Sequence, residues 1–309
     1  MSTVRTAPSS GVSFLVVAGI LWGTGGLFGR MLGDATGLTS LAVAAYRLAV
    51  GGLLIVGYLL VTGSRLPRSR AAWARICAVG ALSALFQAAY FTSVSLTSVT
   101  VATLVTIGSS PVLVLLLRPR SADRRSLAAV GLALAGLVLL VGVPADGGPS
   151  TAAVLAGAGC ALAAAAGFTT MSLLGARPVP GLDAMTTTGA GFTLGGVLLA
   201  PLAMATSGLA FVPTAASTGL LLAFGLVPTA VAYSCYFAGL RRATAGVGVV
   251  MALLEPLTAA VLSAVLLGER LGSSGIAGGV LLCTALVLTA QGRGVRGRSA
   301  RGQGRERSA

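Results

Sequence analysis

Long apolar runs, separated by short segments that carry arginines, dominate this chain of 309 residues. Hydrophobic residues make up 55% of the chain and charged residues 9%, which is too little polar surface to cover a water-soluble domain. About 20 apolar residues are enough for a helix to cross a bilayer. We therefore predict an all-α integral membrane protein with ten transmembrane helices, at residues 12–30, 38–61, 74–94, 98–117, 126–143, 152–174, 183–205, 217–239, 244–267 and 273–291.

The arginines predict how these spans are oriented. With the N-terminus in the cytoplasm, 18 of the 21 arginines lie in cytoplasmic segments, whereas Arg30 and Arg270 lie outside and Arg47 lies within a span. Cytoplasmic loops are enriched in arginine in this way, so we expect both termini in the cytoplasm. The net charge of +14 would suggest nucleic-acid binding in a soluble protein, but topology explains it here and no nucleic acid is expected. The alanine- and glycine-rich composition, with arginine as the only cation, is typical of a GC-rich bacterial genome and hence of a plasma (inner) membrane.

The chain repeats one pattern. In the first half, Tyr90-Phe91 precedes an apolar run that reaches Ser110-Pro111, and in the second half Tyr236-Phe237 precedes a similar run that reaches Glu255-Pro256. We interpret residues 12–143 and 152–291 as two five-helix copies. The segment 1–11 is then a cytoplasmic N-terminal tail, and the glycine- and arginine-rich segment 292–309 a disordered basic cytoplasmic tail.

The charges that flank this pattern are inverted between the copies. The turn at 95–97 is uncharged whereas its counterpart holds Arg241-Arg242. The next loop reverses the difference, with four arginines between 118 and 125 in the first copy and only Glu269-Arg270 in the second. Matching loops therefore lie on opposite sides of the membrane, as an odd number of spans per copy requires. Inverted repeats of this kind are found in many secondary transporters.

Two charged residues fall inside predicted spans. A carboxylate at the centre of a span costs about 2.5–3.5 kcal/mol on insertion scales, so Glu255 invites a functional role as a proton carrier or as the counter-charge of a cationic group. The alternative is a structural glutamate, hydrogen-bonded inside the bundle. Arg47 cannot shed its charge. It either pairs with Glu255, holds a substrate carboxylate or caps carbonyls of a broken helix.

Polar and aromatic residues recur at helical spacing on the third, fourth, eighth and ninth spans, where they can line a cavity for an amphipathic solute. Pro111 and Pro256 occupy matching mid-membrane positions and are either hinges or packing kinks. The predicted pathway residues are Trp22, Arg47, Gln87, Tyr90, Thr103, Ser110, Tyr233, Tyr236, Met251 and Glu255.

Other motifs are structural in this interpretation. Three G-x-x-x-G pairs, Gly19/Gly23, Gly191/Gly195 and Gly275/Gly279, allow close approach of helix backbones. The four cysteines lie in apolar spans and are expected to be small core residues. The chain has no histidine, and no metal site or cofactor is predicted.

The residues Trp22-Gly23, Tyr46-Arg47, Glu255-Pro256 and the segment 267–270 (Leu-Gly-Glu-Arg) resemble the EamA-type transporters, a family of the drug/metabolite transporter (DMT) superfamily, in its drug/metabolite exporter branch. The resemblance covers roughly residues 12–291 and is closer in the second copy. After the fourth span the first copy has Arg118-Pro119-Arg120 in place of the family's glycine-glutamate-arginine pattern. The resemblance implies a ten-helix bundle with a central cavity that exports small metabolites, amino acids or drugs.

These observations predict a secondary-active exporter that works by alternating access on a small-molecule substrate in a lipid bilayer, with Glu255 as the candidate coupling group. An uncoupled facilitator or exchanger of the same solutes would use the same pathway. A membrane-embedded enzyme needs clustered catalytic groups, which seven scattered acids and no histidine do not supply. A channel would need rings of like charge or filter loops. The sequence carries no signal for an oligomeric state.

Overall fold

The structure is a computed structural model that describes residues 9–64, 67–118, 123–141, 150–206, 208–266 and 272–306. Within these ranges the chain is helical, apart from loops and one isolated bridge, which confirms the all-α prediction. The helices are α1 (Ser9–Gly23), α2 (Gly25–Thr36), α3 (Ser40–Val61), α4 (Arg70–Leu96), α5 (Val99–Leu117), α6 (Arg124–Val141), α7 (Thr151–Gly175), α8 (Ala184–Thr206), α9 (Ala215–Gly225), the π-helix η2 (Leu226–Val231), α10 (Ala232–Leu240), α11 (Ala245–Met251), α12 (Leu254–Leu266) and α13 (Ser273–Glu306).

Length and composition let these helices cross a membrane. In the part of the chain that the structure describes, nine helical segments are long and apolar enough, and Val101–Leu117 in α5 is an apolar helix just below that length. The first span is longer than predicted, because α2 continues to Thr36 and ends where Gly37 adopts a left-handed conformation (φ 72°). Its last turns leave the apolar zone, since Arg30 and Asp34 pair 4.0 Å apart with exposed side chains.

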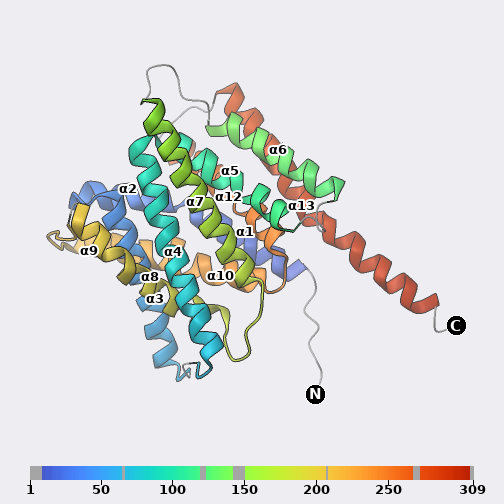
Figure 1. Ribbon diagram of the computed structural model, residues 1–309, viewed down its shortest axis with the longest axis horizontal. Helices are drawn as coiled ribbons and strands as arrows, with labels where there is room; N and C mark the ends of the chain where they lie inside the picture. Colours follow the sequence, from blue (N-terminus) through green and yellow to red (C-terminus); the bar gives the residue numbers. More distant parts are fainter. Residues whose placement is uncertain are drawn as a thin grey trace.

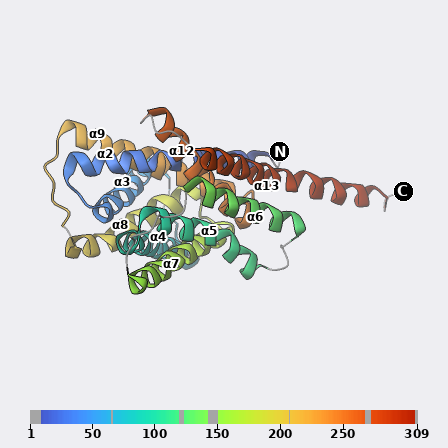
Figure 2. The ribbon, with the colours of Figure 1, turned by 90° about the horizontal axis from the view of Figure 1, so that it is seen from above.

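Small residues set the helix packing. In Figures 1 and 2, α13 runs alongside α6 and then extends beyond the bundle. A Cβ added to Gly278 of α13 would lie 2.6 Å from the Gly136 carbonyl oxygen of α6, so these backbones are in direct contact. The pair α3 and α8 is equally close, because a Cβ on Gly52 would lie 2.8 Å from the Gly189 carbonyl oxygen. Lipid supplies no hydrophobic drive between helices, and small residues let them associate by close contact.

Three spans are interrupted near the middle. The first breaks at Thr24, between α1 and α2. The eighth contains η2, in which Pro228 sits and the Thr229 hydroxyl donates to the Phe224 carbonyl oxygen (3.0 Å). The ninth breaks between α11 and α12. The elements around these breaks contact one another, with α1 against α10, α11, α12 and η2.

Proline explains the break in the ninth span. The ring of Pro256 would clash with the carbonyl of Ala252, four residues earlier. The chain instead makes a tighter turn there, in which the Glu255 amide donates to the Ala252 carbonyl oxygen (3.0 Å). Pro111 has no such effect, because α5 continues as a helix through it. The two copies are therefore not kinked alike.

α13 continues as a helix through Glu306, residues 307–309 lie outside the described residues, and the disordered tail stays a prediction. Extending an existing helix needs no new nucleation, and arginine is a good helix former. The preceding turns of α13 therefore allow the helix to continue to Glu306.

Segments predicted to share the cytoplasmic side lie at one end of the bundle. They surround a cavity of about 470 Å³ between the ends of α5 and α7, the beginnings of α6 and α11, and the middle of α13. Its lining residues include Arg118, Arg125, Arg177, Thr244 and Val247. Arg118 and Arg125, on either side of the loop after α5, and Thr244, before α11, are thus at the same end, as the inverted-repeat interpretation requires.

Two arginines fasten the loop between α7 and α8 at this end. Arg75 of α4 donates to carbonyl oxygens of the last turn of α7 and of Arg177 (2.9 Å for the latter). Arg241 donates to the Leu182 carbonyl oxygen (2.6 Å). Partial burial lowers the pKa of the Arg241 guanidinium, and the nearby Asp183 carboxylate opposes that shift. Arg75 therefore joins the two copies, whereas Arg241 joins two segments of the second copy.

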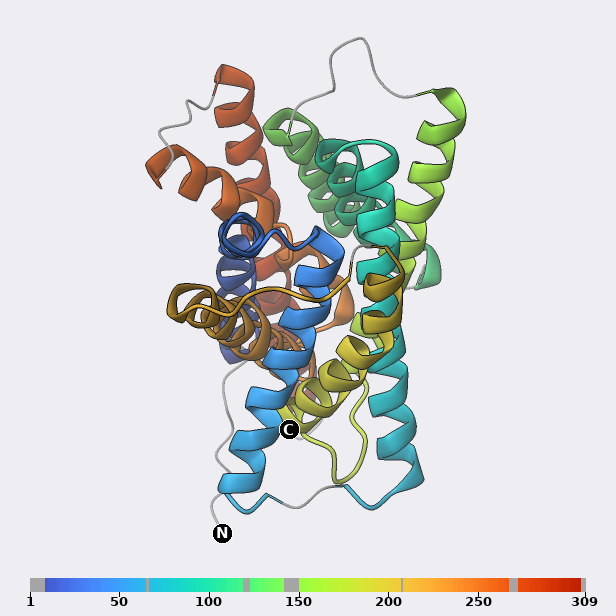
Figure 3. The ribbon, with the colours of Figure 1, turned by 90° about the vertical axis from the view of Figure 1, so that its left-hand side faces the viewer.

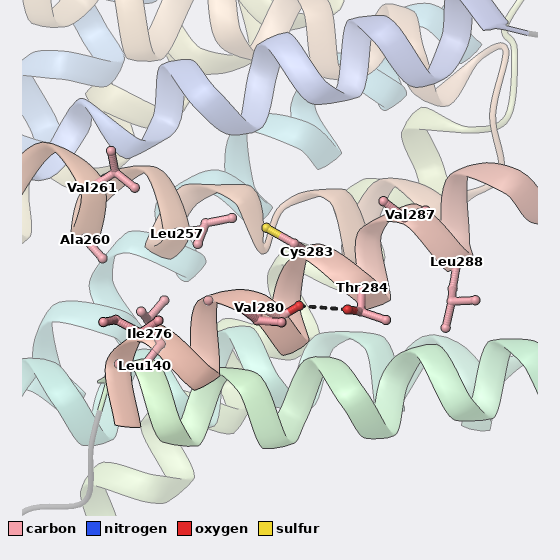
Figure 4. A pocket seen from close by; sticks show the side chains of 12 residues that line it. Leu140, Leu257, Ala260, Val261, Ile276, Val280, Cys283, Thr284, Val287 and Leu288 are labelled. Carbon is pink, nitrogen blue, oxygen red and sulfur yellow. Dashed lines mark hydrogen bonds between the residues drawn. The ribbon is translucent and has the colours of Figure 1, made fainter. Parts of the chain in front are cut away.

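An apolar groove of about 550 Å³ separates α12 from α13 on the outer surface (Figure 4). Leu257, Ala260 and Val261 line it from α12, and Val280 and Cys283 line it from α13. None of the residues of α12 is fully buried. Cys283 is exposed in this groove, contrary to the prediction of a core residue, and Cys77 is exposed as well.

Candidate functional site

Opposite charges from the two copies face the same region of the bundle. Arg47 comes from the middle of α3 and Glu255 from the first turn of α12, and both residues are half-buried. The two charges interact electrostatically. Among the described residues, however, no ion pair within 4.0 Å joins them. A charge inside a span normally has a partner, so two unpaired charges at this depth mark a functional site.

Neutral groups surround the Arg47 guanidinium. The Gln87 amide oxygen accepts from Nε (3.2 Å) and from a terminal nitrogen, in the amide orientation that avoids a clash between donors. The Tyr233 phenol contacts the same guanidinium. The ring of Phe224 lies beneath it, with the ring centre 5.5 Å from Cζ. Arg47 is thus held in place without an acidic partner.

Glu255 lies where a helix favours a negative charge. It is in the first turn of α12, next to the positive end of the helix dipole. The helix is seated against α1, because a Cβ on Gly23 would lie 2.9 Å from the Glu255 carbonyl oxygen and even closer to Thr258. The predicted Gly19/Gly23 pair therefore positions the half-helix that carries the acid.

Aromatic rings form a wall on one side of the site. Trp22 packs on Tyr233 and Tyr236, with ring centres 4.7 and 4.8 Å apart, and on Phe168 at 6.1 Å. The Tyr236 hydroxyl is hydrogen-bonded to the Ser172 hydroxyl (2.7 Å). The Trp22 indole N–H is buried, and the described part of the chain offers it no hydrogen-bond partner.

The remaining predicted residues divide into two groups. Tyr90 is hydrogen-bonded to Thr103 (2.8 Å) and lies within the electrostatic reach of both Arg47 and Glu255. Ser110 and Met251 are buried, with 2% and 1% of their surface exposed. The Ser110 hydroxyl donates to a carbonyl oxygen of its own helix (2.8 Å), so it contributes to packing in this structure.

Several features of the site were missed in the sequence. Phe224 and Phe168 contact predicted residues but belong to apolar runs that give no signal of their own. The break at Thr24 is flanked by glycines, and Pro228 is a mid-span proline, so both positions carried a readable signal for an irregular helix. Within the described residues, no three acidic or cysteine side chains gather as metal ligands.

Comparison with known proteins identifies the family of the chain. The profile of the EamA-like transporter family matches twice, over residues 9–142 and 153–291. The chain belongs to the EamA-like transporter family. Its members are multi-pass membrane transporters of the DMT superfamily, so the apolar helices are membrane spans and the activity is membrane transport.

The chain is also similar to individual relatives. It is 31% identical over 283 residues to the uncharacterized transporter YwfM of Bacillus subtilis (strain 168), covering 89% of this chain and 92% of the relative. A solved crystal structure, described only as that of a protein, has a TM-score of 0.74 at 21% identity and covers 92% of this chain and 99% of its own. The latter likeness concerns the fold. The EamA-like segment at 267–270 lies outside the described residues, so the structure does not describe that part of the resemblance.

Proposed function

We propose that this EamA-like protein is a secondary-active carrier that exports a small amphipathic solute, a metabolite, amino acid or drug, by alternating access. The observation that carries the proposal is the central pair of unpaired, half-buried charges, Arg47 and Glu255, contributed by different copies. Half-helices that meet at the midplane of two repeats are a common site of substrate and ion binding in transporters.

Glu255 is the proposed coupling group. It is the carboxylate that lies nearest the interrupted helices, and the break before it lets α12 move relative to α11. Protonation would remove its charge and its electrostatic interaction with Arg47, which gives a means of linking proton uptake to a change in the bundle. An uncoupled facilitator would use the same pathway without this step.

The orientation follows from the arginine distribution. We propose a location in the plasma (inner) membrane with both termini in the cytoplasm, because 18 of 21 arginines then face the cytoplasm. The cavity lined by Arg118, Arg125 and Arg177 is then the cytoplasmic vestibule of the pathway.

The experiment has two stages. Extracellular metabolites are first compared between cells with and without the protein, which identifies an exported solute. That solute is then loaded into proteoliposomes with and without a pH gradient. We expect the gradient to change efflux by the wild-type protein, and Glu255→Gln to abolish the change.

Asp34→Asn is the matched control, because its carboxylate is exposed on α2 and should leave the gradient response intact. If Glu255→Gln responds to the gradient as the wild type does, the coupling role is wrong and a facilitator remains. If no solute accumulates outside the cells and none crosses the liposome membrane, the exporter proposal is wrong.

A further inference from the structure

We infer that the break between α1 and α2 is a binding site for a carboxylate, and that the transported solute carries one. The inference rests on the proposed function, because it assigns a substrate class to the same central site. Three sets of hydrogen-bond donors lie at or next to this break: the first amide groups of α2, the Arg47 guanidinium and the Trp22 indole.

The first set is the N-terminus of α2. This helix is 12 residues long, and its opening turn, Gly25 to Leu27, has no acceptor within the helix. In the described chain, no hydrogen bond joins these amide groups to another element. Thr24 does not cap them, since its hydroxyl donates to the Leu21 carbonyl oxygen (2.7 Å). Free N–H groups and the helix dipole together favour an anion.

The second set belongs to Arg47. One terminal nitrogen lies 3.9 Å from the position that a Cβ on Gly25 would occupy, so the guanidinium is beside the helix end. Gln87 takes part of its donor capacity, and no carboxylate is within ion-pairing distance in the described residues. A guanidinium offers five donors in a fork that matches the two oxygens of a carboxylate.

The third donor is the Trp22 indole, three residues before Gly25. Its side chain is 5% exposed and its N–H has no partner in the described chain. A buried donor without a partner costs about 1–3 kcal/mol. Its ring packs on Tyr233, which contacts Arg47, so the Trp22 ring belongs to the same cluster.

The charges around the N-terminus of α2 favour a ligand with a single negative charge. Gly26, in the first turn of α2, is exposed, and a Cβ on it would meet no atom within 4 Å. Glu255 supplies a carboxylate to the N-terminus of its own helix, α12, whereas the N-terminus of α2 has none. One guanidinium and one helix end, with Glu255 nearby, suit a carboxylate better than a doubly charged phosphate.

The test uses Trp22 as its own reporter. The chain has two tryptophans, so Trp73→Phe leaves Trp22 as the sole tryptophan, which can be excited selectively over the tyrosines. The probes are phenylacetate, 3-phenylpropionate, octanoate and N-acetylphenylalanine, each with its carboxamide, together with phenyl phosphate. We expect at least one acid to change Trp22 emission saturably, and its amide to need at least a tenfold higher concentration.

Variants of Arg47 and Trp22 measure how much each side chain contributes to binding of the acid. Arg47→Gln should weaken binding of that acid by about 10- to 100-fold, and Arg47→Lys keeps the test valid if the glutamine variant does not fold. Arg30→Gln is the matched control, since this arginine is exposed on α2 and should not change binding. Trp22→Phe removes the N–H together with part of the ring, and ligand-induced thermal stabilisation should then show a loss of about 2- to 10-fold in affinity.

Three ligand results overturn the inference: an acid and its amide bind equally, no acid in the set binds, or phenyl phosphate binds more tightly than every acid. It is also overturned if Arg47→Gln and Arg47→Lys bind the acid as the wild type does. These results are distinct from a failure of the proposed function. Acids that bind but do not cross proteoliposomes would leave the site intact and remove the transport proposal, and an unchanged gradient response in Glu255→Gln would remove only the coupling.

Discussion

Replacing Gly23 by alanine tests the contact that seats the acid-bearing half-helix. A Cβ at position 23 would lie 2.8 Å from Thr258 Cγ2 and 2.9 Å from the Glu255 carbonyl oxygen, with a still shorter contact to Thr258 Cβ. Backbone atoms cannot rotate away as a flexible side chain can. We therefore expect α12 to shift outward, away from α1, and to take Glu255 with it.

The magnitude follows from two opposing effects. Overpacking a tight contact costs about 1–3 kcal/mol. Alanine recovers up to about 1 kcal/mol relative to glycine inside a helix. The net loss of stability should be about 0–2 kcal/mol, which lowers the melting temperature by up to a few degrees. Transport should fall as well, because the charge of Glu255 moves away from Arg47.

The assay is thermal unfolding of purified protein together with flux in proteoliposomes. Gly57→Ala on α3 is the control, because a Cβ there meets no atom within 4 Å and should only stabilise its helix. Thr258→Gly, combined with Gly23→Ala, should restore part of the loss by removing the side chain that clashes. If Gly23→Ala is as stable and as active as Gly57→Ala, the close contact between α1 and α12 is not needed and our reasoning is wrong.

Three further predictions concern other contacts. Ser172→Ala should lower the free energy of unfolding by about 1–3 kcal/mol, because it leaves the buried Tyr236 hydroxyl unpaired. Tyr236→Phe should lower it by about 1 kcal/mol, because the Ser172 hydroxyl keeps its backbone acceptor. Equal melting temperatures of the two variants would contradict this order. Arg75→Gln should lower the free energy of unfolding by about 1.5–3 kcal/mol. An unchanged melting temperature would show that the hydrogen bonds from Arg75 to the end of α7 are dispensable. Ser126→Cys and Thr244→Cys, in a chain without its native cysteines, should react with an impermeant thiol reagent from the same side of the membrane, and labelling from opposite sides would refute the inverted repeat.

The sequence predicted the helices well because apolar length is a local property. It also pointed to Arg47 and Glu255, since a charge within a span is costly wherever the helix packs. The side chains that surround Arg47 and Glu255 could not be predicted from the sequence. Phe224 lies far from Arg47 in sequence, and nothing in an apolar run distinguishes a ring beneath a guanidinium from one in lipid.

Residues of small polar type were the least predictable. Ser110 was expected to line the pathway but bonds to its own helix, which is the usual fate of a serine hydroxyl within a helix. Pro111 and Pro256 match in sequence, yet only the second interrupts its span, because helix continuity depends on what surrounds the freed carbonyl. Roles for these residues stay predictions.

The position of α2 beside α9, seen in Figures 1 and 3, gives the break at Thr24 a rigid outer neighbour. By contrast, α12 faces the groove of about 550 Å³ that separates it from α13. A membrane leaves no such space empty, so hydrocarbon tails fill it. Any swing of α12 toward α13 must first expel those tails, and the speed of the cycle is therefore tied to how fluid the surrounding bilayer is.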